Sequence, residues 1–233
     1  MRLLAVLGLL IIGGGALQLS PPPEIGDRIV PLKRQSGLTG DLRVAVFGTS
    51  LARRAEWPGR IDGRPVPCGT GIFRVTVMGK AGAGSRDGLA LLHAADVADE
   101  DMAILEYAIN DADLTDGISR RESRANHRHM IATLRDRNPD IAIILMATNP
   151  VRGLQRLKRP RLNTYYRDYA ELADEAHASF FDGTIRWRTA GVDRIGMPDG
   201  LHPVPAVEVD LYQKDLTALL AQIAGSKCRH AER

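Results

Sequence analysis

Short apolar runs alternate with longer amphipathic stretches along this chain from about residue 41. Each apolar run has the length of a buried strand in a parallel sheet and stops at polar or turn-forming residues. The runs are Val44–Phe47, Ile72–Met78, Met102–Ala108, Ile141–Ala147 and Ala178–Phe181. The helical patterns are Asp87–Ala98, Arg120–Arg137, Leu162–Ala176 and Val204–Ala224.

Strands that alternate with helices of this length indicate βαβ units with right-handed crossovers. We therefore expect an α/β fold with three layers (α/β/α), in which a five-stranded parallel sheet forms the centre, as in flavodoxin-like proteins. Ligands of such sheets bind just beyond the carboxyl ends of the strands. The pattern predicts one folded domain over residues 41–226, followed by a basic tail at 227–233.

The first 20 residues have a different character. Met1 and Arg2 precede the almost wholly apolar stretch Leu3–Leu17, which is typical of a secretory signal and is short for a membrane span of about twenty residues. We expect export to the periplasm or the cell exterior, and an uncleaved membrane anchor at residues 3–19 is the alternative. Residues 21–40 begin with three prolines and are expected to form an extended linker.

Charge and residue usage narrow the candidate functions. The 233 residues carry a net charge of +3. The one basic cluster lacks the interleaved aromatic residues of proteins that bind single-stranded nucleic acids. We therefore expect no nucleic-acid partner, and we expect this cluster to be a solvated surface. Its members are Arg152, Arg156, Lys158, Arg159, Arg161 and Arg167. The histidines are not spaced among cysteines or acidic residues as metal ligands are. His127 and His129 fall on different faces of a predicted helix, so we expect them to face solvent and not to share a metal. In an exported protein Cys68 and Cys228 could form a disulfide, but the sequence alone does not show that they come within bridging distance.

Four features of the sequence bear on chemistry. Ser50 follows the first predicted strand, Gly82 lies in the glycine-rich turn after the second, and Asn110 follows the third. Asp199 precedes His202 by three residues on a predicted turn, where a buried carboxylate would fix the tautomer of the imidazole. Taken singly, each is also typical of a helix cap or a loop. The glycine-rich turn fits neither the Gly-x-Gly-x-x-Gly dinucleotide fingerprint nor the P-loop pattern, so a nucleotide-binding domain is the weaker alternative.

Together and in this order, the four features resemble the blocks of the SGNH hydrolase superfamily, also called the GDSL esterase family, from Arg43 to about Ala224. Gly-Thr-Ser-Leu at residues 48–51 is similar to its first block, and Gly82 with the Gly-Leu pair at 88–89 is similar to its second. Ile-Asn-Asp at 109–111 and Asp-Gly-Leu-His-Pro at 199–203 resemble the third and the last. Thr49 and Ala108 depart from the usual Asp and Gly, which indicates a divergent subgroup.

The resemblance implies a serine esterase that works through an acyl-enzyme, without a cofactor or a metal. Ser50 would be the nucleophile, His202 the general base and acid, and Asp199 the residue that orients the imidazole. The backbone N–H groups of Ser50 and Gly82 and the side-chain amide of Asn110 would form the oxyanion hole.

For an exported enzyme we expect a small-molecule or polysaccharide ester as substrate, in particular an acetyl ester. A lipid ester or thioester is an alternative, and so is a non-catalytic, exported polysaccharide-binding accessory protein. The segment Trp57–Val66, with Arg53 and Arg54 before it, is expected at the rim of the site, although surface charge and one packing indole explain it equally well. The residues that bind the substrate and the oligomeric state stay unassigned.

Overall fold

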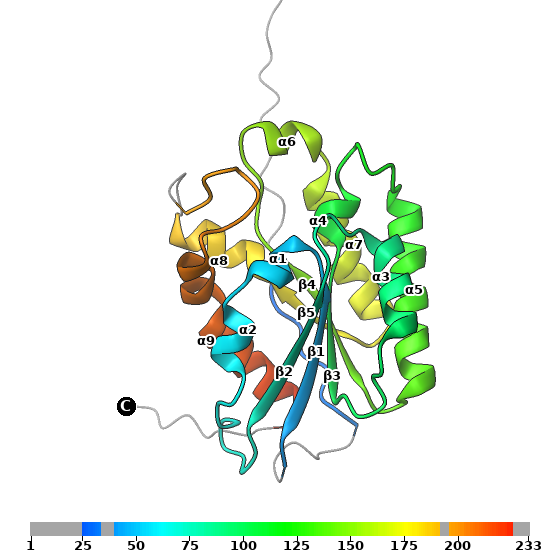
Figure 1. Cartoon of the computed structure of the whole chain (residues 1–233), viewed down its shortest axis with the longest axis vertical. Coiled ribbons are helices and arrows are strands. Elements are labelled where there is room, and N and C mark those ends of the chain that lie inside the picture. The colour runs from blue at the N-terminus through cyan, green and yellow to red at the C-terminus, as the bar shows by residue number, and fades with distance from the viewer. Residues whose placement is uncertain (1–24, 34–39, 192–195, 226–233) are drawn as a thin grey trace, which may run out of the picture.

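The computed structural model describes residues 25–33, 40–191 and 196–225, which form a sheet between two layers of helices (Figure 1). Five strands, all parallel, lie in the order β2-β1-β3-β4-β5. They are β1 (Leu42–Gly48), β2 (Phe73–Gly79), β3 (Met102–Glu106), β4 (Ala142–Ala147) and β5 (Ser179–Asp182). The predicted α/β fold with a central five-stranded parallel sheet is confirmed.

The helices divide between the two faces of the sheet and its carboxyl edge (Figure 1). One face is covered by α3 (Ser85–Ala94), α5 (Arg120–Arg137) and α7 (Leu162–Glu175), and the other by α2 (Trp57–Ile61), α8 (Gly183–Ala190) and α9 (Pro205–Ile223). Three short helices lie toward the carboxyl ends of the strands, namely α1 (Ser50–Arg54), α4 (Ala108–Asp111) and α6 (Leu154–Lys158).

The central strands are apolar on both faces because helices cover both. In β1, Ala45 and Phe47 pack toward the α3, α5 and α7 layer, while Val44 and Val46 pack toward the α2, α8 and α9 layer. All four side chains are at most 1% exposed. This two-sided burial is the reason why the strand reads as a continuous apolar run and not as an alternating one.

The register of the sheet brings three strand ends to one level. Gly48 at the end of β1 pairs with Gly79 of β2 on one side and with Glu106 of β3 on the other. A Cβ atom at Gly48 would lie 2.7 Å from Cβ of Ala52 and 2.8 Å from Oε2 of Glu106, so only glycine fits there. The segments that follow these three strands therefore start side by side at the carboxyl edge.

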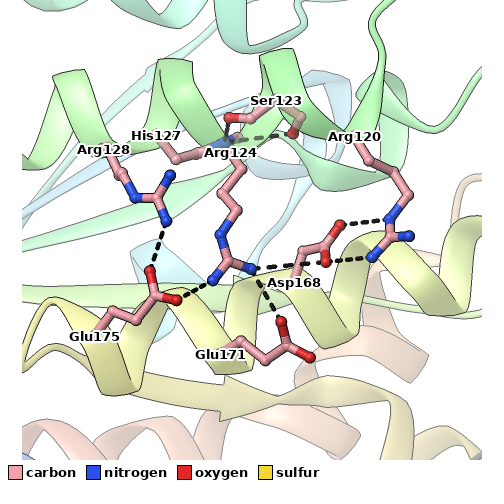
Figure 2. A network of polar contacts seen from close by, with 8 residues as sticks. All are labelled: Arg120, Ser123, Arg124, His127, Arg128, Asp168, Glu171 and Glu175. Atoms are coloured by element: carbon pink, nitrogen blue, oxygen red, sulfur yellow. Dashed lines mark hydrogen bonds and ion pairs between the residues drawn. The ribbon is translucent and has the colours of Figure 1, made fainter.

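Ion pairs tie α5 to α7 on the outside of their layer (Figure 2). Arg120 donates two hydrogen bonds to Asp168, at 2.8 and 2.6 Å. Arg124, with a side chain only 18% exposed, contacts both Glu171 and Glu175. Exposed ion pairs contribute little singly, but a shared network with bidentate geometry holds two helices in a fixed register.

The structure corrects the expectation that His127 is solvent-exposed, because its side chain is fully buried beneath this network (Figure 2). Its Nδ1 lies 2.6 Å from the carbonyl oxygen of Ser123, and its Nε2 lies 2.6 Å from Oη of Tyr169. Burial lowers the pKa of His127. The imidazole is therefore neutral and serves as a packed hydrogen-bonding group between α5 and α7.

β3 ends at Glu106, two residues before the predicted Ala108. The reason is a long-range contact, since the N–H groups of Tyr107 and Ala108 both donate to Oη of Tyr169, at 2.9 and 3.0 Å. The backbone then enters α4. Asn110 consequently lies in a short helix and not in a turn directly after the strand.

The described part of the predicted linker is not a linker. Arg28 forms an antiparallel bridge with Phe180 of β5, and the N–H of Leu32 donates to the carbonyl oxygen of Ile223 at 2.7 Å. Of the two interpretations of Trp57, the packing indole is confirmed, because this first residue of α2 is 2% exposed and packs in the core and not at a rim.

Three expectations fall outside the described residues: the secretory signal at 1–20, the tail at 227–233, and the pairing of Cys68 with Cys228. Within the described ranges, no helix combines the length and the apolar character that crossing a bilayer requires.

Candidate active site

Ser50 begins α1 immediately after β1, at the carboxyl edge of the sheet. The preceding residue, Thr49, caps the helix, because its Oγ1 accepts a hydrogen bond from the N–H of Leu51 at 3.1 Å. This cap frees Ser50 from the capping function that serines in such positions often have. Oγ of Ser50 instead lies 2.8 Å from Nε2 of His202.

His202 and Asp199 come to Ser50 from the turn before α9. Nδ1 of His202 lies 2.7 Å from Oδ2 of Asp199. Because a carboxylate only accepts hydrogen bonds, Nδ1 must carry the proton, and Nε2 is left as the acceptor for the Ser50 hydroxyl. The structure thus brings the predicted serine, histidine and aspartate together in one hydrogen-bonded chain.

Asp199 differs from the expectation of a buried carboxylate, since its side chain is 50% exposed while that of His202 is 19% exposed. Its partial burial favours a higher pKa. Hydrogen bonds from the N–H groups of Leu201 and His202, at 2.9 and 2.7 Å, and from the His202 ring outweigh that effect and lower the pKa of Asp199 to about 2. Asp199 is therefore ionised at every pH at which the protein would work.

The turn that carries Asp199 and His202 is tied to the segment that follows β4. Gly200 has φ +77°, and a Cβ atom there would lie 2.5 Å from the carbonyl oxygen of Arg152. The N–H of Arg152 donates to the carbonyl oxygen of Gly200 at 2.8 Å, and Nδ2 of Asn149 donates to that of Leu201 at 2.9 Å. Glycine is thus required for both conformation and close approach.

Gly82 and Asn110, the other two predicted residues, meet through the turn between β2 and α3. Gly82 has φ +73°, a conformation that favours glycine. Next to it, the carbonyl oxygen of Ala83 accepts a hydrogen bond from Nδ2 of Asn110 at 2.9 Å. Asp111, the neighbour of Asn110, holds the same turn, because its Oδ1 accepts from the N–H of Ser85 at 2.7 Å.

Glu106 is a site residue that the sequence reasoning did not single out. Its Oε2 accepts hydrogen bonds from the N–H and the Oγ1–H of Thr49, at 3.0 and 2.9 Å, and thereby fixes the residue before Ser50. Burial raises the pKa of Glu106 to about 7, although these bonds from Thr49 oppose the shift. An acidic residue inside the apolar run predicted over Met102–Ala108 was the available signal.

The basic cluster is not uniformly solvated. Arg159 is 6% exposed and pairs with Asp113, with 2.8 Å between Nη2 and Oδ2. Its Nε donates to the carbonyl oxygen of Ile109 at 2.8 Å. The expectation of a solvent-facing role is therefore wrong for Arg159.

For metals, no group of three or more His, Cys, Asp or Glu side chains gathers in the part of the chain that the structure covers.

Comparison with known proteins places this geometry in context. Residues 40–207 match the model of the GDSL-like Lipase/Acylhydrolase family. No protein of curated function matches the sequence significantly.

Several solved structures share the fold at low sequence identity. A lipase/acylhydrolase from Enterococcus faecalis superposes with a TM-score of 0.63 and 20% identity, covering 79% of this chain and 96% of its own. A carbohydrate acetylesterase family member from Sinorhizobium meliloti superposes with a TM-score of 0.59 and 16% identity, covering 79% of this chain and 100% of its own. For a catalytic mutant of an acetylxylan esterase from Geobacillus stearothermophilus, the TM-score is 0.58 and the identity 19%, and the match covers 77% of this chain and 94% of the esterase.

Proposed function

The chain belongs to the GDSL-like lipase/acylhydrolase family and is an ester-bond hydrolase, and from this premise we propose that it is a serine esterase that removes short acyl groups, in particular acetyl, from an extracytoplasmic polysaccharide. The observation that carries the proposal is the hydrogen-bonded chain from Ser50 through His202 to Asp199, with 2.8 and 2.7 Å between the bonded atoms.

In this proposal, Oγ of Ser50 attacks the ester carbonyl carbon while its proton passes to Nε2 of His202. Asp199 stabilises the imidazolium that forms. His202 then returns the proton to the leaving alcohol oxygen as the carbon–oxygen bond breaks, which leaves an acyl group on Ser50. A water molecule, deprotonated by His202, attacks the acyl carbon, and the protonated imidazole gives the proton back to Oγ as the acid leaves.

The tetrahedral intermediate carries a negative oxygen, which needs donors aimed at it. Ser50 is the first residue of α1, so its N–H has no acceptor within the helix. We assign this N–H, the N–H of Gly82 and the side-chain amide of Asn110 to the oxyanion hole. No step in this sequence calls for a cofactor or a metal.

Support for an acetyl substrate comes from two of the similar structures, which are a carbohydrate acetylesterase family member and an acetylxylan esterase. Export rests on the apolar segment Leu3–Leu17. A lipid ester or thioester hydrolase of the same family is the competing function. A non-catalytic accessory protein is disfavoured because the serine, histidine and aspartate are hydrogen-bonded as a hydrolase requires.

The test is hydrolysis of p-nitrophenyl acetate, p-nitrophenyl octanoate and acetylated xylan by the full chain, with Ser50→Ala beside it. Ser179→Ala, a serine-to-alanine change on β5 at the edge of the sheet, is the matched control. We expect acetate release that Ser50→Ala abolishes and the control retains. Preference for octanoate would support the lipid esterase instead, and full activity of Ser50→Ala would refute the proposed nucleophile.

A further inference from the structure

The short helix α4, which carries Asn110, is held at both ends by side chains from distant parts of the chain. At its start, Oη of Tyr169 accepts the N–H groups of Tyr107 and Ala108. At its end, Nε of Arg159 donates to the carbonyl oxygen of Ile109 at 2.8 Å. The last carbonyls of a helix lack partners within the helix, so a guanidinium there satisfies an acceptor that would otherwise be unpaired.

Arg159 also reaches the side chain of Asn110, because its Nη2 lies 3.4 Å from Oδ1. A guanidinium only donates hydrogen bonds, so it selects the oxygen of the amide. On the opposite side the carbonyl oxygen of Ala83 only accepts, and it selects Nδ2 at 2.9 Å. These two contacts fix which way the amide faces. The amide nitrogen has two N–H groups, and only one of them is used by Ala83.

The guanidinium of Arg159 is itself locked in place. The side chains of Arg159 and Asp113 are 5% and 7% exposed, and 2.8 Å separates Nη2 from Oδ2. Burial favours a higher pKa for Asp113, but the hydrogen bonds from Thr115 and the charge of Arg159 hold that pKa below its usual value. Asp113 is therefore charged, and the buried pair keeps the guanidinium against α4. A lysine, with a single charged nitrogen, would reach fewer of these acceptors.

We propose that Arg159 is a positioning residue for ester hydrolysis, which holds the Asn110 amide so that its second N–H is offered to the oxyanion. The inference rests on the proposed role of Asn110 in the oxyanion hole. Arg159 itself does not touch the reacting atoms. Because an oxyanion exists only in the transition state and the intermediate, loss of this orientation lowers kcat and leaves KM nearly unchanged.

A double-mutant cycle on p-nitrophenyl acetate tests whether Arg159 acts through Asn110. Loss of one oxyanion donor costs roughly a hundredfold to a thousandfold in rate, so we expect Arg159→Met to lower kcat by about ten- to a hundredfold, and Arg159→Lys by less. In the Asn110→Ala background, Arg159→Met is expected to lower kcat by less than about threefold. Equal losses in the two backgrounds would overturn the proposal.

Two further variants separate positioning from general destabilisation. Arg186→Met removes another poorly exposed arginine, which pairs with Asp27 and Asp215 on the other side of the sheet, and it is expected to lower the melting temperature but not kcat. If Arg159→Met does not fold, the uncharged pair Arg159→Gln/Asp113→Asn replaces it in the same cycle, with the same expected pattern.

A spectroscopic measurement tests the positioning without any turnover. The side-chain NH₂ signals of Asn110, assigned by their loss in Asn110→Ala, are compared by ¹⁵N NMR between the wild type and Arg159→Met. We expect two well-separated proton signals in the wild type, which shift together or broaden in the variant, and no change in Arg186→Met. Unchanged Asn110 signals in Arg159→Met would overturn the positioning role, whereas an active Ser50→Ala enzyme would instead refute the proposed function.

Discussion

Glu208 offers a quantitative test of the electrostatics beneath the nucleophile. It is 3% exposed on α9 and shares a cavity of about 10 Å³ with Glu106, Trp57, Thr148 and apolar side chains. Oε1 of Glu106 has no hydrogen-bond partner among the described residues. Burial, with a smaller contribution from the charge of Glu106, raises the pKa of Glu208 from 4.5 to about 8.

The raised pKa makes the stability of the fold depend on pH. Below pH 4.5 the carboxyl is protonated in both the folded and the unfolded chain, so it contributes no difference. Between about pH 4.5 and 8 the unfolded chain ionises while the folded one keeps its proton, and the free energy of unfolding therefore falls as the pH rises. Each pH unit in this window removes about 1.4 kcal/mol, or roughly 5 kcal/mol in total.

Glu208→Gln removes this proton-binding group while preserving the shape of the neutral carboxyl. We expect the stability of the variant relative to the wild type to increase by roughly 4 kcal/mol from pH 5 to pH 8. Urea unfolding at each pH, followed by tryptophan fluorescence, measures the difference, since Trp57 lines the cavity. Glu56→Gln, the same substitution at an exposed surface carboxyl, is the control. A difference that stays constant with pH would refute the reasoning.

Three further substitutions test how the site is held. Asn110→Ala is expected to lower kcat by roughly a hundredfold or more and to leave KM within about threefold, as steady-state kinetics on p-nitrophenyl acetate would show; a change in KM alone would make Asn110 a ground-state binder. Thr49→Val removes both the α1 cap and a donor to Glu106, and should lower the free energy of unfolding by about 2 kcal/mol in urea titrations; an unchanged value would mean that these bonds add no net stability. Gly200→Ala forces a Cβ atom against Arg152 at positive φ, so both kcat and melting temperature should fall, and a fully active variant would contradict the tight fit of that turn.

The sequence predicted the fold well because its signals are local. Buried strands such as β1 and β4 are continuous apolar runs that end at glycine or polar residues, and α5 has the bounds that its amphipathic pattern predicts. The short helices α1, α2, α4, α6 and α8 were not predicted, since each has four to eight residues and too few turns to establish a period.

The residues of the candidate site that could be predicted are those whose place follows from the order of strands and helices along the chain. Ser50, Asp199 and His202 were named from their positions in the chain together with the resemblance of their blocks to the GDSL family, and the structure brings them within hydrogen-bonding distance. Glu106 and Arg159 could not be recognised in the same way. Their roles depend on partners 57 and about 50 residues away in the chain, and such pairings appear only when the fold is known.

The most direct measurement of the central claim is covalent labelling of the full chain with a fluorophosphonate, followed by digestion and mass spectrometry. We expect a single adduct on Oγ of Ser50, formed slowly in His202→Ala and absent in Ser50→Ala. Ester hydrolysis by a chain that carries its adduct on another residue, or that stays unlabelled at Ser50, would contradict the assignment of Ser50 as the nucleophile.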